Sequence, residues 1–222
     1  MNNSGKKMKI YVMRHGETMS NKEGRLQGWT DNPLNDYGIM LAELTGEGMK
    51  EAGISFDAVF SSSLSRAYET ARIIKEKTGS NVEIQVDDRI KEIHMGDWEG
   101  KKFRPGESEI DPVESKKFFS NPLKSAGFPG GEGVRDVMVR TQEFLREVAA
   151  KDYKSVLVSC HGCSLRSMLN FLYDDPENFW HGRVPVNCAV SILEAVDGKI
   201  TLIESDRVFY DKDLVIDRYV KF

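Results

Sequence analysis

Residues 9–16 read Lys9-Ile10-Tyr11-Val12-Met13-Arg14-His15-Gly16, an apolar run that ends at an arginine, a histidine and a glycine. The run is short and rich in β-branched and aromatic side chains, which is typical of a buried strand. The polar residues that follow it predict a loop. We therefore expect this strand to bring Arg14 and His15 to one end of a sheet.

The same order of strand, loop and helix recurs along the chain. Further apolar runs predict strands over 56–60, 82–86, 155–159, 188–195 and 199–203. Helical spacing of apolar side chains predicts helices over about 38–52, 134–149 and 164–173. Another helix is expected after Ser61-Ser62-Ser63, whose hydroxyl groups would cap its first turn.

Strands that alternate with helices predict an α/β fold. Its sheet should be mainly parallel, with helices on both faces. The last two predicted strands flank Asp197-Gly198, a hairpin turn signal, so we expect an antiparallel hairpin to close the sheet. A chain of 222 residues fits one such domain over 1–222 better than two separate ones.

Composition excludes several classes of protein. Lys plus Arg is 31 and Asp plus Glu is 35, and the net charge of −4 argues against nucleic acid or an anionic membrane as partner. No apolar run approaches the roughly 18 to 20 residues of a membrane span. The polar opening residues lack a secretory signal. We expect a cytoplasmic protein.

The chain has three cysteines, Cys160, Cys163 and Cys188. This small and odd number does not suit a disulfide framework. Cys160 and Cys163 form a C-x-x-C motif with His161 between them. This motif occurs in redox-active cysteine pairs and supplies half of the ligands in some zinc sites. No second pair completes a zinc site, so we expect no metal and interpret both cysteines as small packing residues.

Chemically reactive side chains follow four of the predicted strands. In chain order they are Arg14 and His15, then Arg66, Glu92 and His161. In open α/β sheets, ligands bind outside the carboxyl ends of the strands. Each residue alone has an ordinary structural explanation, but together they predict one active site.

Two arginines at one site indicate a dianionic phosphoryl group, because the guanidinium fork matches phosphate oxygens. The chain carries no Gly-rich nucleotide loop and no acidic cluster suited to Mg²⁺. A neutral imidazole is nucleophilic near pH 7, which makes His15 the candidate nucleophile. Glu92 is the candidate proton donor to the leaving group. His161, in its protonated form, would stabilise charge in the transition state.

These residues resemble the histidine phosphatase superfamily, also called the phosphoglycerate mutase-like family, over most of the chain. The likeness lies in five separated motifs in the family's order, namely Arg14-His15-Gly16-Glu17-Thr18, Gly24-Arg25-Leu26-Gln27-Gly28-Trp29, Ser62-Ser63-Leu64-Ser65-Arg66-Ala67, Glu92 with Trp98-Glu99-Gly100, and His161-Gly162 with Arg166. Cys163 departs from the family's commoner spelling, in which glycine follows His-Gly.

The resemblance implies a three-layer α/β sandwich and catalysis without any cofactor. It implies that His15 carries the phosphoryl group and that Glu92 donates the proton. It further implies a set of phosphate-binding residues, which are Arg14, Asn21, Gln27, Gly28, Arg66 and His161.

Hydrolases and mutases share these motifs, so the resemblance leaves the reaction open. The family's cofactor-dependent mutases follow the glutamate with Arg-His-Tyr-Gly and a long basic insertion ending in paired arginines, whereas this chain has Ile93-His94-Met95-Gly96 and no such pair. We therefore favour a phosphatase acting on phosphate monoesters of small metabolites. A phosphoglycerate mutase-type transferase and a non-catalytic phosphate-binding scaffold stay as alternative functions. The expected partner is a small phosphorylated metabolite, and the chain could also form a homodimer.

The segment over about 101–131 is an irregular excursion that we expect to cover the site as a lid and set its specificity. Its phenylalanines either line the site or pack the excursion down; they are Phe103, Phe118, Phe119 and Phe128.

Overall fold

The first strand, β1 (Lys7–Arg14), forms the centre of a mixed six-stranded sheet with the order β3-β2-β4-β1-β5-β6. The computed structural model describes residues 6–216. Ile10 and Val12 point into one hydrophobic cluster, and Tyr11 and Met13 point into another on the opposite face. A strand buried on both faces has to be apolar throughout, which explains its unbroken run.

Three strands run parallel to β1 and extend the sheet to one edge, and a hairpin extends it to the other edge. The parallel strands are β2 (Ala58–Ser61), β3 (Ile84–Val86) and β4 (Ser155–Cys160). The hairpin consists of β5 (Val190–Val196), antiparallel to β1, and β6 (Lys199–Arg207). The predicted mainly parallel sheet with an antiparallel hairpin is confirmed.

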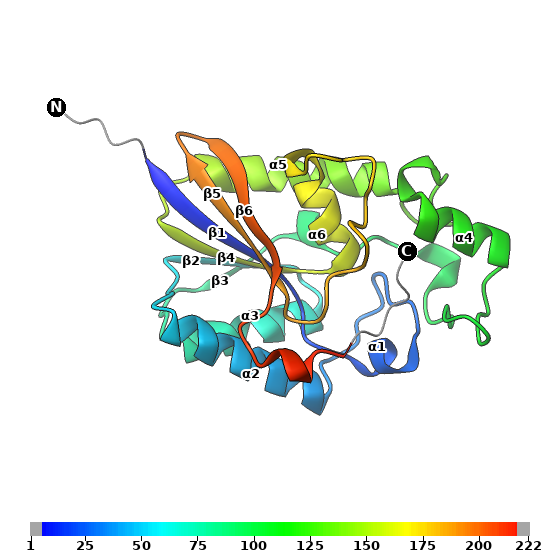
Figure 1. Cartoon of the computed structure of the whole chain (residues 1–222), viewed down its shortest axis with the longest axis horizontal. Coiled ribbons are helices and arrows are strands. Elements are labelled where there is room, and N and C mark those ends of the chain that lie inside the picture. The colour runs from blue at the N-terminus through cyan, green and yellow to red at the C-terminus, as the bar shows by residue number, and fades with distance from the viewer. Residues whose placement is uncertain (1–5, 217–222) are drawn as a thin grey trace.

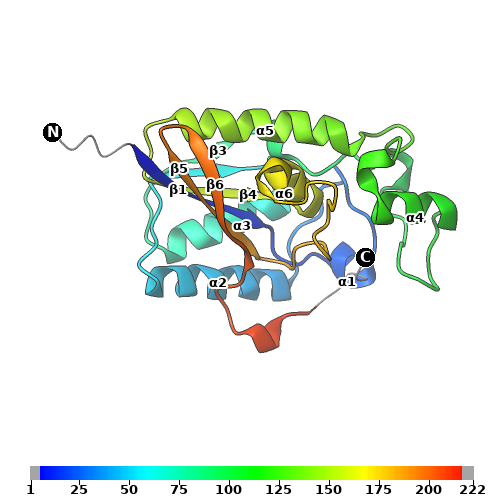
Figure 2. The ribbon, with the colours of Figure 1, turned by 45° about the horizontal axis from the view of Figure 1, so that its top comes forward.

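Helices cover both faces of the sheet, as Figures 1 and 2 show. On one face lie α2 (Asp36–Glu51) and α3 (Ser65–Lys77), and on the other lie α5 (Val134–Ala150) and α6 (Gly162–Leu169). The expected three-layer α/β sandwich is therefore confirmed. Within residues 6–216, no helix has both the length and the apolarity that a membrane crossing needs.

Shorter helices connect these layers. Two of them are α-helical, α1 (Met19–Glu23) and α4 (Pro112–Ser120). The 3-10 turns are η1 (Asp88–Ile90), η2 (Gly96–Trp98), η3 (Pro122–Lys124), η4 (Asn170–Leu172) and η5 (Lys212–Leu214). Helix α4 belongs to the excursion over 101–131 and lies at the end of the molecule toward α1 (Figure 1).

One local prediction was wrong, and one predicted helix has different bounds. The serines at 61–63 do not cap α3, because β2 continues through Ser61, and Ser61 and Ser62 turn into the interior. Asp31 caps the helix instead, since its Oδ1 accepts hydrogen bonds from the backbone N–H of Ser65 (2.8 Å) and from its hydroxyl (2.7 Å). The helix predicted over 164–173 starts at Gly162 and gives way to a 3-10 turn after Leu169.

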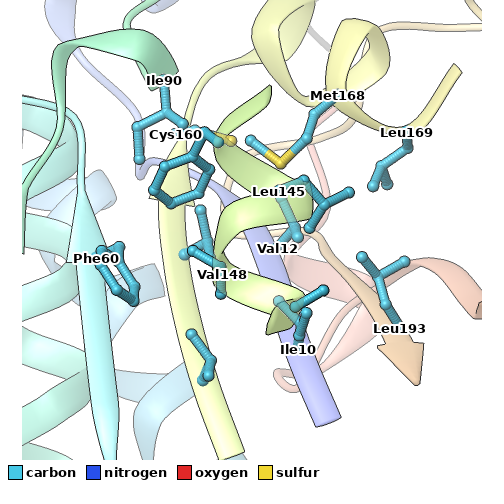
Figure 3. Close-up of a cluster of buried hydrophobic side chains, with 14 of the residues drawn as sticks. Ile10, Val12, Phe60, Ile90, Leu145, Val148, Cys160, Met168, Leu169 and Leu193 are labelled. Atoms are coloured by element: carbon cyan, nitrogen blue, oxygen red, sulfur yellow. The ribbon is translucent and has the colours of Figure 1, made fainter. Parts of the chain in front are cut away.

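A cluster of buried hydrophobic side chains lies between the sheet and the helices α5 and α6 (Figure 3). Phe144 of α5 is 1% exposed and packs edge-on against Phe60 of β2, with 5.4 Å between the ring centroids. Cys160 lies in the same cluster, which confirms its interpretation as a packing residue. Cys163 is buried in a third cluster, which the excursion forms with neighbouring loops.

Phe144→Ala should lower the free energy of unfolding by about 3–5 kcal/mol, because it leaves a cavity between α5 and the sheet. Urea denaturation followed by circular dichroism measures this change. Val139→Ala on the same helix is the matched control, because Val139 is 70% exposed; its effect should stay within about 0.5 kcal/mol. Equal effects of the two substitutions would contradict the described packing.

Candidate active site

The predicted site residues meet at the carboxyl ends of the parallel strands. Arg14 and His15 end β1, Arg66 opens α3 after β2, and His161 joins β4 to α6. One pocket is lined by Arg14, His15, Asn21, Gln27, Gly28, Arg66 and Glu92. The His161 ring lies beside it, with its centroid 5.1 Å from that of His15. The structure thus brings together every residue that the sequence proposed for the site.

The His15 ring is oriented by the loop that follows β1. Its Nδ1 lies 2.6 Å from the backbone carbonyl oxygen of Gly16, which accepts a hydrogen bond from the Nδ1–H tautomer. The N–H of Gly16 in turn donates to the hydroxyl of Thr70 in α3 (3.0 Å). A Cβ on Gly16 would lie 2.5 Å from the Gly38 carbonyl oxygen, so the loop sits tightly against α2. With Nδ1 protonated, the lone pair of His15 is on Nε2.

Burial and positive charge keep both histidines neutral. Desolvation, followed by Arg66 and Arg14, lowers the pKa of His15 well below its ordinary value. Desolvation and Arg66 likewise lower the pKa of His161. The direction of this shift disfavours a proton on the free His161 ring, and the role of His161 in the transition state stays a prediction. Its Nε2 lies 2.9 Å from the hydroxyl oxygen of Ser62.

Backbone carbonyl groups hold the two arginines in place. Arg66 donates through Nη1 to the carbonyl of Thr30 (2.9 Å) and through Nη2 to that of Gly28 (2.8 Å). Arg14 donates through Nη1 to the carbonyl of Pro185 (2.6 Å). Both side chains are almost completely buried. Two fixed cations in one small pocket favour an anion between them.

The Glu92 carboxylate is bound at the start of α6. It accepts hydrogen bonds from the backbone N–H groups of Ile93 (3.0 Å), Cys163 (3.2 Å) and Ser164 (3.0 Å). Its own backbone carbonyl accepts from Trp29 Nε1 (2.8 Å) and Arg140 Nη2 (2.9 Å). The main chain and the carboxylate of Glu92 are thus both fixed beside the pocket.

Sequence reasoning missed several residues that orient the site. Ser62 was interpreted as a helix cap, but it contacts His161. Glu99 holds the loop that binds Arg66, by accepting from the N–H groups of Trp29 and Thr30 (both 2.8 Å). Its place in the Trp98-Glu99-Gly100 motif was the available signal. Asn187 donates to the His15 carbonyl (3.1 Å) from 172 positions away, which no local pattern indicates.

Aromatic side chains of the excursion close the pocket on its other side. Phe103, Phe118 and Phe119 line it, as does Trp180 from the loop before β5. Phe128 packs against Phe118, with 4.6 Å between the ring centroids. It therefore holds the excursion in place rather than lining the pocket. The remaining cavity measures about 50 Å³.

The cysteines next to His161 are buried free thiols. Burial raises the pKa of Cys160 to about 12 and that of Cys163 well above its ordinary value, which keeps both protonated. Among residues 6–216, no three His, Cys, Asp or Glu side chains are grouped so that they could hold a metal ion.

Comparison with known proteins links the chain to one family. The sequence model of the histidine phosphatase superfamily (branch 1) matches residues 10–206. A 2,3-bisphosphoglycerate-dependent phosphoglycerate mutase of Borrelia garinii is 31% identical over 191 residues, which are 74% of this chain and 77% of that protein.

Solved structures agree with this match. Bacillus stearothermophilus YhfR superimposes with a TM-score of 0.80 at 31% identity, over 90% of this chain and 98% of that chain. A phosphoserine phosphatase of Entamoeba histolytica, solved with phosphoserine, superimposes with a TM-score of 0.72 at 27% identity, over 90% and 96% of the two chains.

The neutral histidines make stability depend on pH. Below about pH 6.5 the unfolded chain takes up protons at His15 and His161 that the folded protein does not, so the free energy of unfolding should fall as the pH is lowered from about 7 to 5. Each ring adds a slope of up to about 1.4 kcal/mol per pH unit. Urea denaturation at a series of pH values measures this slope. It should be smaller in a His15→Gln/His161→Gln double variant, and equal slopes would contradict neutral burial.

Proposed function

The chain belongs to the histidine phosphatase superfamily, and from that premise we propose that it is a phosphatase acting on phosphate monoesters of small metabolites through a phosphohistidine at His15. No metal or organic cofactor takes part in the proposed reaction. Three free buried cysteines support a reducing compartment, and we propose the cytoplasm.

One observation carries this proposal. The His15 ring lines the pocket together with Arg14 and Arg66. The Gly16 carbonyl oxygen accepts a hydrogen bond from the Nδ1–H of His15, with 2.6 Å between nitrogen and oxygen. The remaining nitrogen, Nε2, is then a neutral nucleophile beside two fixed cations. This arrangement supports attack on a phosphorus atom, because the arginines would hold the phosphoryl oxygens so that phosphorus faces Nε2 with the leaving oxygen on the opposite side.

In the first proposed step, the Nε2 lone pair of His15 forms a bond to phosphorus as the ester P–O bond breaks. Arg14 and Arg66 compensate the charge on the equatorial oxygens in the loose transition state. The buried Nδ1 of His161 has no hydrogen-bond partner among the described residues. As Nδ1–H it would donate to one of these oxygens, with Ser62 donating to Nε2.

Glu92 serves both halves of the proposed reaction. Protonated, it donates its proton to the departing alcohol oxygen. As a carboxylate, it then accepts a proton from a water molecule, whose oxygen bonds to phosphorus while the N–P bond breaks and its electron pair returns to His15. Glu92 lines the pocket with His15, and its three backbone hydrogen bonds support a fixed position for this exchange.

A mutase is the second candidate, because the mutase of Borrelia garinii is 31% identical. Mutase action requires a second anionic group of the substrate to be bound. The third arginine of the pocket wall is Arg25, whose Nε lies 3.0 Å from a carboxylate oxygen of Glu23 and whose Nη1 lies 3.6 Å from one of Glu109. Its charge is already compensated, which favours the hydrolase.

The protein should release p-nitrophenol from p-nitrophenyl phosphate at an unchanged rate in EDTA, because every proposed catalytic group is a side chain. His15→Ala should lower kcat by at least about 1,000-fold through loss of the nucleophile. A metal-dependent phosphatase would lose activity in EDTA, and a phosphate-binding scaffold would show none. Rapid isomerisation of 3-phosphoglycerate that depends on 2,3-bisphosphoglycerate would overturn the hydrolase in favour of the mutase.

Glu92→Gln should slow the hydrolysis of alkyl phosphates by about 100-fold or more, because a poor leaving group needs the donated proton. Hydrolysis of p-nitrophenyl phosphate should be affected much less in its first step, since p-nitrophenolate leaves without protonation. Stopped-flow measurement of p-nitrophenol release in the first turnover, beside steady-state rates for an alkyl phosphate, separates the two effects. Equal losses in both would rule out Glu92 as the proton donor.

A further inference from the structure

The wall of the pocket opposite the phosphate-binding residues is a continuous aromatic surface. Phe103 stacks on Phe119 at 5.6 Å between ring centroids, and Phe119 meets Phe118 edge-on at 5.1 Å. Phe118 meets Trp180 edge-on at 5.9 Å. These four rings come from two segments far apart in the sequence, the excursion and the loop before β5. We call them the aromatic wall.

The aromatic wall is anchored to the segment that carries Asn21 and Gln27, two of the predicted phosphate-binding residues. The backbone N–H of Phe103 donates to the Gly24 carbonyl (3.1 Å), and Arg104 donates to the Asn21 carbonyl (2.9 Å). Leu26 donates its N–H to the Lys101 carbonyl (3.0 Å). A substrate whose phosphoryl group lies between Arg14 and Arg66 therefore has its alcohol portion directed to a surface held at a fixed distance.

The charge of the pocket wall is concentrated on its phosphate side. In the described part of the chain, three arginines line the pocket; Arg14 and Arg66 lie beside His15, and Arg25 pairs with Glu23 and Glu109. A carboxylate on the substrate would lose its hydration against aromatic rings without gaining a cation, which is costly. An apolar group would gain by leaving water.

We propose that the preferred substrates are phosphate monoesters of aromatic or alkyl alcohols that carry no second anionic group. This inference rests on the proposed phosphatase function and specifies its substrate class. Among the rings of the aromatic wall, Phe119 is only partly buried, whereas the other three are buried. Phe119 also lines the pocket, so we assign to it the contact with the alcohol portion of the substrate.

Three primary alkyl phosphates with similar leaving groups test the substrate class. They are 3-phenylpropyl phosphate, glycerol 1-phosphate and O-phosphoserine. The kcat/KM for 3-phenylpropyl phosphate should exceed both others by at least about tenfold. Equal values for all three, or a preference for phosphoserine that Arg25→Ala abolishes, would overturn the substrate class and leave the phosphatase intact. Failure to hydrolyse any phosphate monoester, p-nitrophenyl phosphate included, would instead overturn the proposed function.

Substitution of Phe119 tests the aromatic wall itself. Phe119→Ala should raise KM for 3-phenylpropyl phosphate about tenfold with little change in kcat, because it removes binding shared by ground and transition states. Phe119→Leu should recover most of the loss. Phe171→Ala is the matched control, since Phe171 is 41% exposed and contacts Arg146 rather than the pocket. Equal effects of Phe119→Ala on 3-phenylpropyl phosphate and glycerol 1-phosphate would contradict the proposal.

Discussion

Two buried guanidinium groups beside two neutral imidazoles are the constraint on which the site depends. Arg14 and Arg66 are withdrawn from water, and backbone carbonyls of Gly28, Thr30 and Pro185 replace part of their hydration. Their positive charge adds to burial in lowering the pKa of His15. The same field that would attract the proposed phosphate dianion therefore keeps His15, the proposed nucleophile, unprotonated.

Around this centre, each reactive side chain is held by a segment distant in sequence. Glu99 fixes the loop whose carbonyls bind Arg66, and Arg140 fixes the backbone of Glu92. Asn187 fixes the backbone of His15. The sheet supplies the common edge, while these polar contacts set the orientations. Preorganisation of this kind lets electrostatic stabilisation act without rearrangement during the reaction.

Sequence reasoning could predict the sheet and the site, because strand-end residues in a parallel sheet share one edge. It could not predict the cap of α3, since Asp31 reaches Ser65 from outside the helix. It could not give the direction in which the pKa of His161 shifts, because the effects of burial and of two arginines depend on distances. The contacts of Asn187 and Arg140 carry no sequence signal, as their acceptors are backbone carbonyls that any residue supplies.

The most direct test of this account is to identify the phosphorylated atom during turnover. Mixing the protein with an excess of p-nitrophenyl phosphate, quenching in alkali to preserve phosphohistidine, and analysing the peptides by mass spectrometry and ³¹P NMR locates the phosphoryl group. The hydrogen bond from Nδ1 of His15 to the Gly16 carbonyl leaves Nε2 as the reactive nitrogen, so phosphorus is expected on Nε2 of His15. A phosphoryl group on Nδ1, on a serine or on no residue at all during turnover would contradict it.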